Sequence, residues 1–101
     1  MTVKNVTIPT IKAFCNLEPK AQALKPLEEA AEVFGAWQSY HMACERNEAK
    51  SGYAAIMLLD EIADCIQACA NLAAMVGVSD LTPYMERCEG RNRERGRYGD
   101  E

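Results

Sequence analysis

The chain has 101 residues, of which 49% are hydrophobic and 26% are charged, and its formal net charge is -4 at pH 7. This length and composition fit one globular domain. The acidic balance argues against general nucleic-acid binding, which favours a basic face, so we expect no nucleic-acid partner. No segment approaches the roughly 18 consecutive apolar residues of a membrane span, so we also expect no membrane association.

The first residues lack the charged start, apolar core and small-residue cleavage site of a signal peptide. We therefore expect a cytoplasmic location. Five cysteines are present, and an odd number without paired spacing is typical of reduced thiols rather than of a disulfide framework.

Residues 1–19 are expected to form an N-terminal arm, extended except for a short helical turn at residues 11–15, and residues 20–98 a helical domain. A helical pattern runs over residues 20–44, with apolar residues at helical spacing, and only Pro26 and Gly35 interrupt it. Since proline removes an internal hydrogen bond, the helix is expected either to kink at Pro26 or to begin there. Residues 45–52 are polar and predict a connection.

The second predicted helix covers residues 53–76. Its apolar stripe consists of Leu58, Ile62, Cys65, Cys69, Leu72 and Met75. Gly77 is expected to end this helix. Thr82 is a predicted N-cap and Pro83 the first residue of a third helix, which runs to about Arg95 and precedes a frayed tail at residues 97–101.

No segment alternates apolar and polar residues for long, so no sheet is predicted. The fold class is therefore all-α, an antiparallel bundle of about three main helices plus the N-terminal arm. Because a domain this small buries a limited fraction of its surface, we expect a homo-oligomer to complete the bundle.

Two acidic clusters lie within the first two predicted helices. On a helix, residues three apart share a face, which pairs Glu29 with Glu32 and Glu61 with Asp64. The short connection makes the helices antiparallel neighbours, with the two pairs offset by roughly 5 Å of helical rise. Four carboxylates are thus predicted to converge between the helices, where their hard oxygens would suit Mg²⁺ or Mn²⁺.

A purely structural interpretation of these acids stays open. If the helix begins at Pro26, Glu28 and Glu29 are first-turn acids that favour the helix dipole. Acidic runs on helices also commonly face solvent.

The spacing Glu28-Glu29-x-x-Glu32, then 28 residues, then Glu61-x-x-Asp64 resembles the EExxE…ExxD signature of the all-α nucleoside triphosphate pyrophosphohydrolases, the MazG-like superfamily. Gln22 and Lys25 precede the first cluster as in many members. The ending Asn92-Arg93-Glu94-Arg95-Gly96-Arg97 resembles the Asn-x-x-x-Gly-Arg ending common there. The resemblance covers about residues 20–98 and is closest to the short, single-domain bacterial and phage type.

The resemblance implies Mg²⁺-dependent hydrolysis of a (deoxy)nucleoside triphosphate to the monophosphate and pyrophosphate, by a homodimer or homotetramer. The implied site residues are metal ligands (Glu29, Glu32, Glu61, Asp64), catalytic residues (Glu32, Glu61), a supporting acid (Glu28) and phosphate- or nucleotide-binding residues (Lys25, Arg91, Asn92, Arg95). Many members carry a lysine where this chain has Cys88. That departure affects the expected phosphate contacts more than the metal site.

Other residues have two interpretations each. The C-terminal arginines would clamp a triphosphate or simply form a solvated helix face with nearby glutamates. Trp37 would stack on a base or belong to a core. The pairs His41–Cys44 and Cys65–Cys69 have zinc-ligand spacing, but the second pair falls in the apolar stripe, where cysteine behaves as a small hydrophobe.

Two alternative functions remain at this point. One is phosphoribosyl-ATP pyrophosphohydrolase activity within the same superfamily. The other is a non-catalytic helical oligomer that binds a protein or a nucleotide, although such a binding module has no need of four crowded carboxylates.

Overall fold

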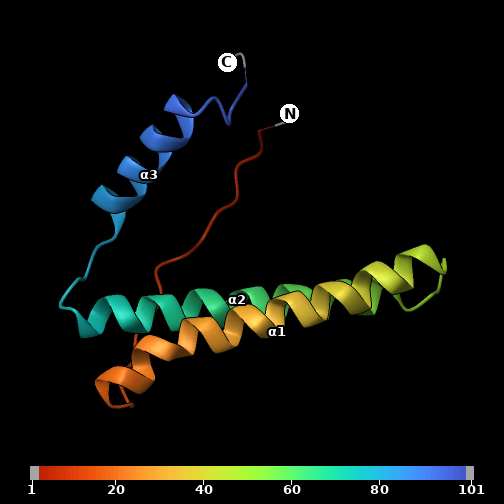
Figure 1. The fold of residues 1–101 in the computed structure, drawn as a ribbon, viewed down its shortest axis with the longest axis horizontal. Coiled ribbons are helices and arrows are strands. Elements are labelled where there is room, and N and C mark those ends of the chain that lie inside the picture. Colours follow the sequence, from red (N-terminus) through yellow and green to blue (C-terminus); the bar gives the residue numbers. More distant parts are fainter. Residues whose placement is uncertain (1–2, 100–101) are drawn as a thin grey trace. The chain divides into compact units, whose positions relative to one another are not determined.

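The computed structural model describes residues 3–99, which contain three α-helices and no strand. These are α1 (Pro19–Glu45), α2 (Ser51–Met75) and α3 (Thr82–Glu94) (Figure 1). The predicted all-α class is therefore confirmed. Two compact units make up the chain: one is Ile11–Gly77, and the other combines residues 3–10 with residues 78–99. Residues 1, 2, 100 and 101 of the expected arm and tail lie outside the described residues.

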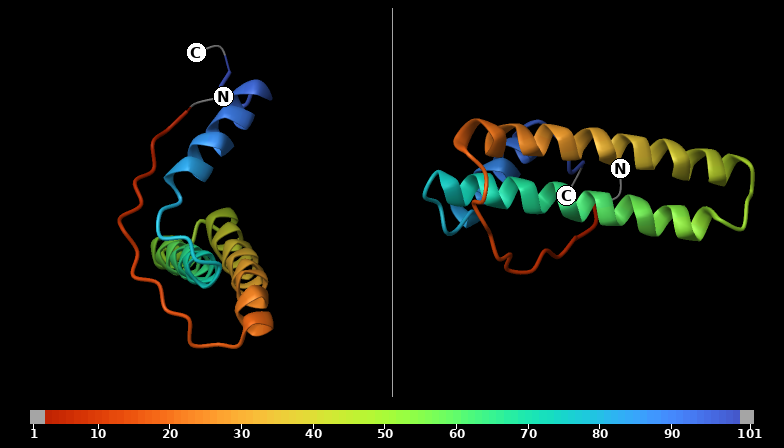
Figure 2. Two further views of the ribbon diagram at one scale, coloured as in Figure 1. Left: turned by 90° about the vertical axis from the view of Figure 1, so that its left-hand side faces the viewer. Right: turned by 90° about the horizontal axis from the view of Figure 1, so that it is seen from below.

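The unit Ile11–Gly77 is built on an antiparallel hairpin, in which α1 and α2 lie side by side (Figure 2). Residues 46–50 connect them, within the predicted polar connection. Asn47 takes a positive φ of 52° there, a conformation that asparagine tolerates better than most residues. The backbone N–H of Glu48 donates to the carbonyl of Ala43, which closes the turn at 3.0 Å. The predicted antiparallel pairing of the two acidic helices is therefore confirmed.

The first helix begins at Pro19, so Pro26 lies inside it. The alternative that the helix begins at Pro26 is wrong, because α1 begins seven residues earlier and continues across Pro26. Glu28 and Glu29 are consequently interior helical residues rather than first-turn acids. Pro26 carries no N–H, so the carbonyl of Gln22, four residues earlier, lacks its usual helical donor.

The segment before α1 is extended, and the helical turn predicted at residues 11–15 is wrong. Side chains of α2 engage its backbone instead. The Phe14 N–H donates to Asn71 Oδ1 at 2.9 Å, and Gln67 Nε2 donates to the Lys12 carbonyl at 2.9 Å. Because these contacts satisfy the backbone from outside, the segment needs no helix of its own. We call residues 11–18 the strap.

The ends of α2 and α3 follow the turn chemistry of the sequence closely. Gly77 follows the last turn of α2 with φ of 97°, as predicted for a helix C-terminus. Thr82 is the first residue of α3 rather than its N-cap, so that prediction is wrong by one position. The reason is Asp80, whose Oδ1 accepts the Thr82 N–H at 2.9 Å. This hydrogen bond lowers the pKa of Asp80.

The hairpin has a small apolar core. Among residues 3–99 only two hydrophobic residues are buried, Ala43 and Ala68. Several large apolar side chains of α1 and α2 are exposed by half or more, namely Leu27, Phe34, Tyr53, Ile56 and Leu59. None of the helices in the described part of the chain is both long and apolar enough to cross a bilayer. All five cysteines are free.

Candidate metal centre

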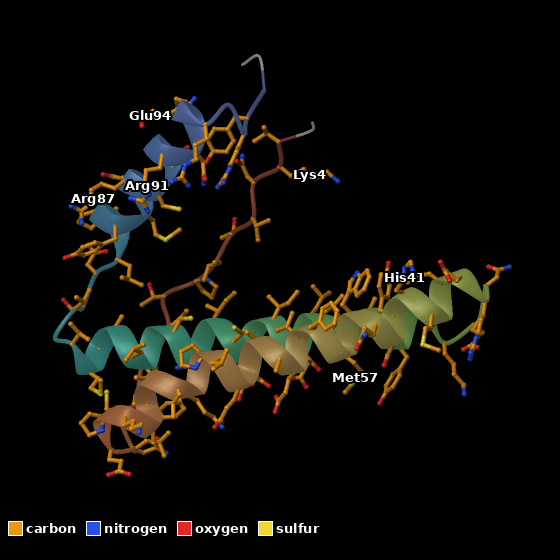
Figure 3. The ribbon with its side chains drawn as sticks, in the orientation of Figure 1. Lys4, His41, Met57, Arg87, Arg91 and Glu94 are labelled. Carbon is orange, nitrogen blue, oxygen red and sulfur yellow. The ribbon has the colours of Figure 1, made fainter. Side chains whose placement is uncertain are left out.

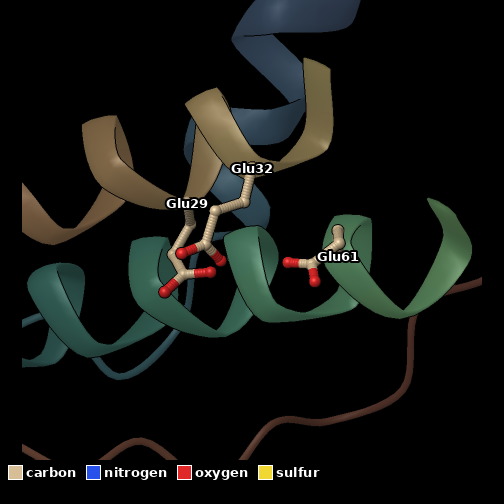
Figure 4. A group of neighbouring side chains, drawn as sticks. All are labelled: Glu29, Glu32 and Glu61. Atoms are coloured by element: carbon tan, nitrogen blue, oxygen red, sulfur yellow. The ribbon is translucent and has the colours of Figure 1, made fainter. Parts of the chain in front are cut away.

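Three carboxylates meet between α1 and α2 (Figure 4). Glu29 and Glu32 lie one turn apart on α1, and Glu61 reaches them from α2. One oxygen from each residue lies within 4.8 Å of the others. We call these three residues the acidic group. Helical periodicity on two antiparallel helices brings them together, as the sequence predicted.

Two oxygens of the acidic group are buried without a hydrogen-bond partner. They are Glu29 Oε2 and Glu61 Oε2. Glu29 as a whole is only 9% exposed. A buried carboxylate without a partner is costly, and natural proteins nearly always compensate it with a donor, a proton or a cation. Glu32, in contrast, is exposed to solvent.

The acidic group fits a small divalent cation. Mg²⁺ binds oxygen at about 2.0–2.1 Å in octahedral geometry, so its ligand oxygens lie about 3–4 Å apart. The oxygens of the acidic group, within 4.8 Å of one another, are close to that range. The donors are hard carboxylate oxygens, the type that Mg²⁺ and Mn²⁺ prefer.

Crowding changes the acidity of Glu29. Burial raises the pKa of its carboxyl, and the hydrogen bond and negative charge of Glu32 raise it further. Asp64 adds a smaller effect in the same direction, whereas the positive charge of Lys25 opposes it. Without a cation, Glu29 therefore favours its protonated form more than an ordinary glutamate does.

Lys25, predicted to bind phosphate, points its charge at neighbouring carboxylates. Its Nζ lies 3.2 Å from Glu28 Oε2 and 3.6 Å from Glu29 Oε1. The hydrogen bond to Glu28 is the main reason why the pKa of Lys25 is raised. Glu28, the predicted supporting acid, is exposed and lies outside the acidic group. Lys25 thus links the acidic group to the outer acid of the signature.

Asp64 is the one predicted ligand that does not join the acidic group. It is exposed on α2, but it lines a cavity together with Glu29 and Lys25. Its charge also contributes to the raised pKa of Glu29. The structure thus brings three of the four predicted ligands together and places the fourth at the border of the site.

This cavity, of about 330 Å³, lies between the hairpin and the strap. Besides the three charged residues, it is lined by four carboxamide residues (Asn16, Gln22, Gln67, Asn71) and three apolar ones (Phe14, Leu17, Ala68). We call it the amide pocket. Its volume is at the lower end of the range of about 300–1,000 Å³ for small-molecule sites. Because Glu29 belongs to both, the pocket adjoins the acidic group.

Sequence reasoning missed Asn71 and gave Gln22 no role of its own. Both are almost fully buried polar residues, although neither lies among the apolar positions of its predicted helix. Their burial depends on packing between the two helices and the strap, so no local pattern identifies them, and a buried amide requires hydrogen-bond partners. Asn71 accordingly accepts hydrogen bonds from Phe14 and Gln67.

The predicted phosphate-binding residues Arg91, Asn92 and Arg95 belong to the other unit, at the end of α3. Arg87 and Arg91 lie one turn apart on this helix (Figure 3). Asn92 Oδ1 accepts a hydrogen bond from the Arg97 guanidinium at 2.9 Å. Gly96, with φ of 69°, makes the turn that lets Arg97 fold back. The Asn-x-x-x-Gly-Arg ending is therefore a closed helix terminus.

The candidate zinc pairs do not form a metal group of three or more ligands in the described part of the chain. His41 Nε2 lies 3.1 Å from Glu45 Oε1 and its ring stacks on Trp37. The Cys65 thiol donates to the Pro26 carbonyl at 4.0 Å, and burial raises its pKa. Trp37 itself is exposed and stacks between Phe34 and His41.

No protein-family model, curated protein or solved structure matches this chain. The resemblance to the MazG-like superfamily therefore stays a prediction. The acidic group and the amide pocket alone support a functional site in this chain.

Proposed function

We propose that this chain is a Mg²⁺-dependent pyrophosphohydrolase of the MazG-like type, which converts a nucleoside triphosphate to the monophosphate and pyrophosphate. The observation that carries the proposal is the proximity of the carboxylates of Glu29, Glu32 and Glu61. Two of their oxygens, one on Glu29 and one on Glu61, are buried without a hydrogen-bond partner. A divalent cation would compensate these charges. Mg²⁺ that is held by carboxylates commonly binds the phosphates of a substrate as well. The proposed place of action is the cytoplasmic nucleotide pool.

The acidic group would hold Mg²⁺, with Asp64 at its border. When bound, the ion neutralises phosphate oxygens and lowers the pKa of a coordinated water. Glu32 is the exposed member of the group, so solvent water reaches it directly. We assign Glu32 as the base that accepts a proton from the attacking water. The oxygen of that water forms a bond to the α-phosphorus. The bond from the α-phosphorus to the bridging oxygen breaks, and pyrophosphate leaves with the electron pair.

We also propose that the active form is a homodimer or homotetramer. The support is the apolar surface of the hairpin, where Leu27, Ile56 and Leu59 are each more than half exposed. A two-helix hairpin with only two buried hydrophobic residues has too small a core to account for a stable domain. Covering these side chains with a second copy would supply the missing apolar burial.

The test is pyrophosphate release from a panel of canonical and modified ribo- and deoxynucleoside triphosphates, first with Mg²⁺ and then with EDTA. Phosphoribosyl-ATP belongs in the panel as the alternative substrate. We expect metal-dependent release with a nucleoside monophosphate as the co-product. The variant Glu61→Gln should keep the helical circular dichroism of the parent and lose at least about a hundredfold in rate, the order of effect of removing a key catalytic group.

A matched control is available on the same helix. Asp60 precedes Glu61 in the sequence, is exposed and lies outside the acidic group. Asp60→Asn removes the same charge from α2, so it should retain the parental rate. If no triphosphate and no phosphoribosyl-ATP is hydrolysed with either Mg²⁺ or Mn²⁺, the proposal is wrong and a non-catalytic helical oligomer becomes the better description.

A further inference from the structure

The amide pocket has two ends of different chemistry. Because α1 and α2 are antiparallel, Gln22 lies near the level of Asn71, and Glu29 near that of Asp64, all four lining the cavity. Seven residues separate the members on each helix, which corresponds to about 10 Å of helical rise. One end of the pocket is therefore acidic and adjoins the acidic group. The other end is neutral and carries carboxamides.

The amide of Asn71 is held in a defined orientation. Its Oδ1 accepts two hydrogen bonds, from the Phe14 N–H and from Gln67 Nε2, both at 2.9 Å. Two donors on one side identify that atom as the oxygen and leave Nδ2 as the free donor. Asn71 is only 4% exposed, so this donor has little access to bulk water.

Gln22 supplies an acceptor at the same end. It is 1% exposed, the most deeply buried side chain in the described part of the protein. Its Oε1 has no hydrogen-bond partner. A buried amide oxygen without a donor is unfavourable, so a ligand that offers a donor there gains affinity.

The neutral end of the pocket also has an aromatic wall. Phe14 lines the cavity, and its backbone is fixed to Asn71 by the strap. Phe14 as a whole is half exposed. Planar rings stack favourably on such a surface.

We propose that the neutral end of the amide pocket binds the nucleobase of the substrate, and that Gln22 and Asn71 determine which base is accepted. An uncharged nucleobase carries a hydrogen-bond donor next to an acceptor, which complements the unpartnered acceptor of Gln22 and the free donor of Asn71. The separation of about 10 Å along the helices leaves room for the sugar between the base and the phosphates at the acidic group. This inference rests on the proposed function, since it treats the two ends as parts of one substrate site.

The first experiment measures base binding without catalysis. The ¹⁵N-labelled protein is titrated with the common deoxynucleosides and ribonucleosides in EDTA, and the side-chain amide signals of Gln22 and Asn71 are followed by NMR. We expect one base to shift both signals at millimolar concentration. Gln22→Met, which keeps the length of the side chain and removes its polar atoms, should weaken that binding by about fivefold to tenfold.

Two further variants keep the test independent of folding. Gln38→Met makes the same change at an exposed position of α1, outside the pocket, and should bind the base as the parent does. Asn71→Asp retains the oxygen that holds the strap but replaces the free donor. It should reduce binding of the preferred base by at least about fivefold while the Phe14 amide stays protected from exchange.

The outcomes separate this inference from the proposed function. Base binding at Gln22 and Asn71 without any triphosphate hydrolysis would refute the enzyme and leave the pocket assignment intact. Hydrolysis with base preference unchanged in both Gln22→Met and Asn71→Asp would refute the pocket assignment and leave the enzyme intact. Nucleosides that move neither amide signal, or that bind Gln22→Met as tightly as the parent, would likewise overturn the pocket assignment.

Discussion

Lys25 forms an ion pair with one carboxylate oxygen of Glu29, and the other oxygen has no hydrogen-bond partner. Its Nζ lies 3.6 Å from Oε1, whereas Oε2 is buried and has no partner. The lysine therefore offsets part of the negative charge of Glu29 and leaves Oε2 without a donor. Its second partner, Glu28, keeps it on the outer side of the acidic group.

Replacing this lysine should strengthen the metal site. The positive charge of Lys25 would repel a cation bound at Glu29, and it also lowers the pKa of Glu29. Lys25→Met removes that repulsion and raises the pKa, but a doubly charged ion gains more from the change than a proton does. We expect the apparent Mg²⁺ affinity to rise by about threefold to tenfold at pH 8 and by less at pH 6, where protons compete. Mg²⁺ titration of the hydrolysis rate measures this, and Lys20→Met, also on α1, is the control. A loss of affinity at pH 8 would contradict this electrostatic effect.

The stability of the metal-free protein should depend on pH through Glu29. Its pKa in the folded protein is raised above the ordinary value of 4.5, so the folded state binds the proton more tightly than the unfolded state. This contribution is complete below about pH 4.5 and is lost as pH rises through the folded pKa. In EDTA, the melting temperature of the parent relative to that of Glu29→Gln should therefore decrease from pH 4.5 to pH 8.

Added Mg²⁺ should reverse that decrease, because it binds the ionised carboxylates of the folded state. Differential scanning fluorimetry of both proteins, with EDTA and with Mg²⁺, gives the four curves needed. A difference between parent and Glu29→Gln that stays constant over the pH range would argue against a perturbed glutamate.

Removing the proline from α1 should stabilise the hairpin. Pro26 deprives the Gln22 carbonyl of its helical donor, and a proline inside a helix costs about 3 kcal/mol. Pro26→Ala restores that hydrogen bond, so we expect the free energy of unfolding in urea to rise by about 1–3 kcal/mol. An unchanged or lower value would mean that the hairpin packing depends on the geometry that the proline imposes.

The strap should detach when Asn71 is truncated. Asn71→Ala removes the acceptor of the Phe14 N–H and the partner of Gln67. Leaving such groups without partners costs about 1–3 kcal/mol. Hydrogen exchange at the Phe14 amide should accelerate markedly in this variant. Gln67→Ala, which removes a bond to Lys12 but spares the Phe14 contact, should leave that amide protected. Equal protection in Asn71→Ala would show that the strap is held by other contacts.

Thermal stability should depend on protein concentration if a second copy covers the apolar surface. The melting temperature of the parent is expected to rise with concentration, with sedimentation showing a dimer or tetramer. Leu59→Lys introduces charge at an exposed apolar position of α2 and should shift the protein toward the monomer. Ala49→Lys, in the connection between the helices, serves as the control. A concentration-independent melting temperature with a monomeric mass would contradict the oligomer.

Helical periodicity made most of the hairpin predictable. The polar connection and Gly77 are local signals, so the predicted ends of the first two helices lie within one or two residues of those observed. The same periodicity placed Glu29, Glu32 and Glu61 on facing surfaces, and the acidic group follows from it. Local patterns suffice wherever a residue's position depends only on its own helix and on one neighbour.

The strap and the amide pocket were not predictable in this way. Phe14 and Asn71 are 57 residues apart in the sequence, and their hydrogen bond decides that the strap is extended rather than helical. The pocket exists only because the strap is held there. Asp64 has helical spacing to Glu61, yet it lies outside the acidic group and lines the pocket beside Glu29 instead.

The acidic group lies far from the turn between α1 and α2. Thirteen residues of α1 follow Glu32 and ten residues of α2 precede Glu61, which corresponds to about 15–20 Å of helix on each side. Insertions or deletions in residues 46–50 would therefore change the number of residues between the two acidic clusters without moving the carboxylates. The site therefore constrains the position of each acidic cluster on its own helix, and not the number of residues between the clusters. This exposed turn is accordingly the natural position for inserting a tag, a fluorophore or a permuted terminus while the carboxylates stay in place.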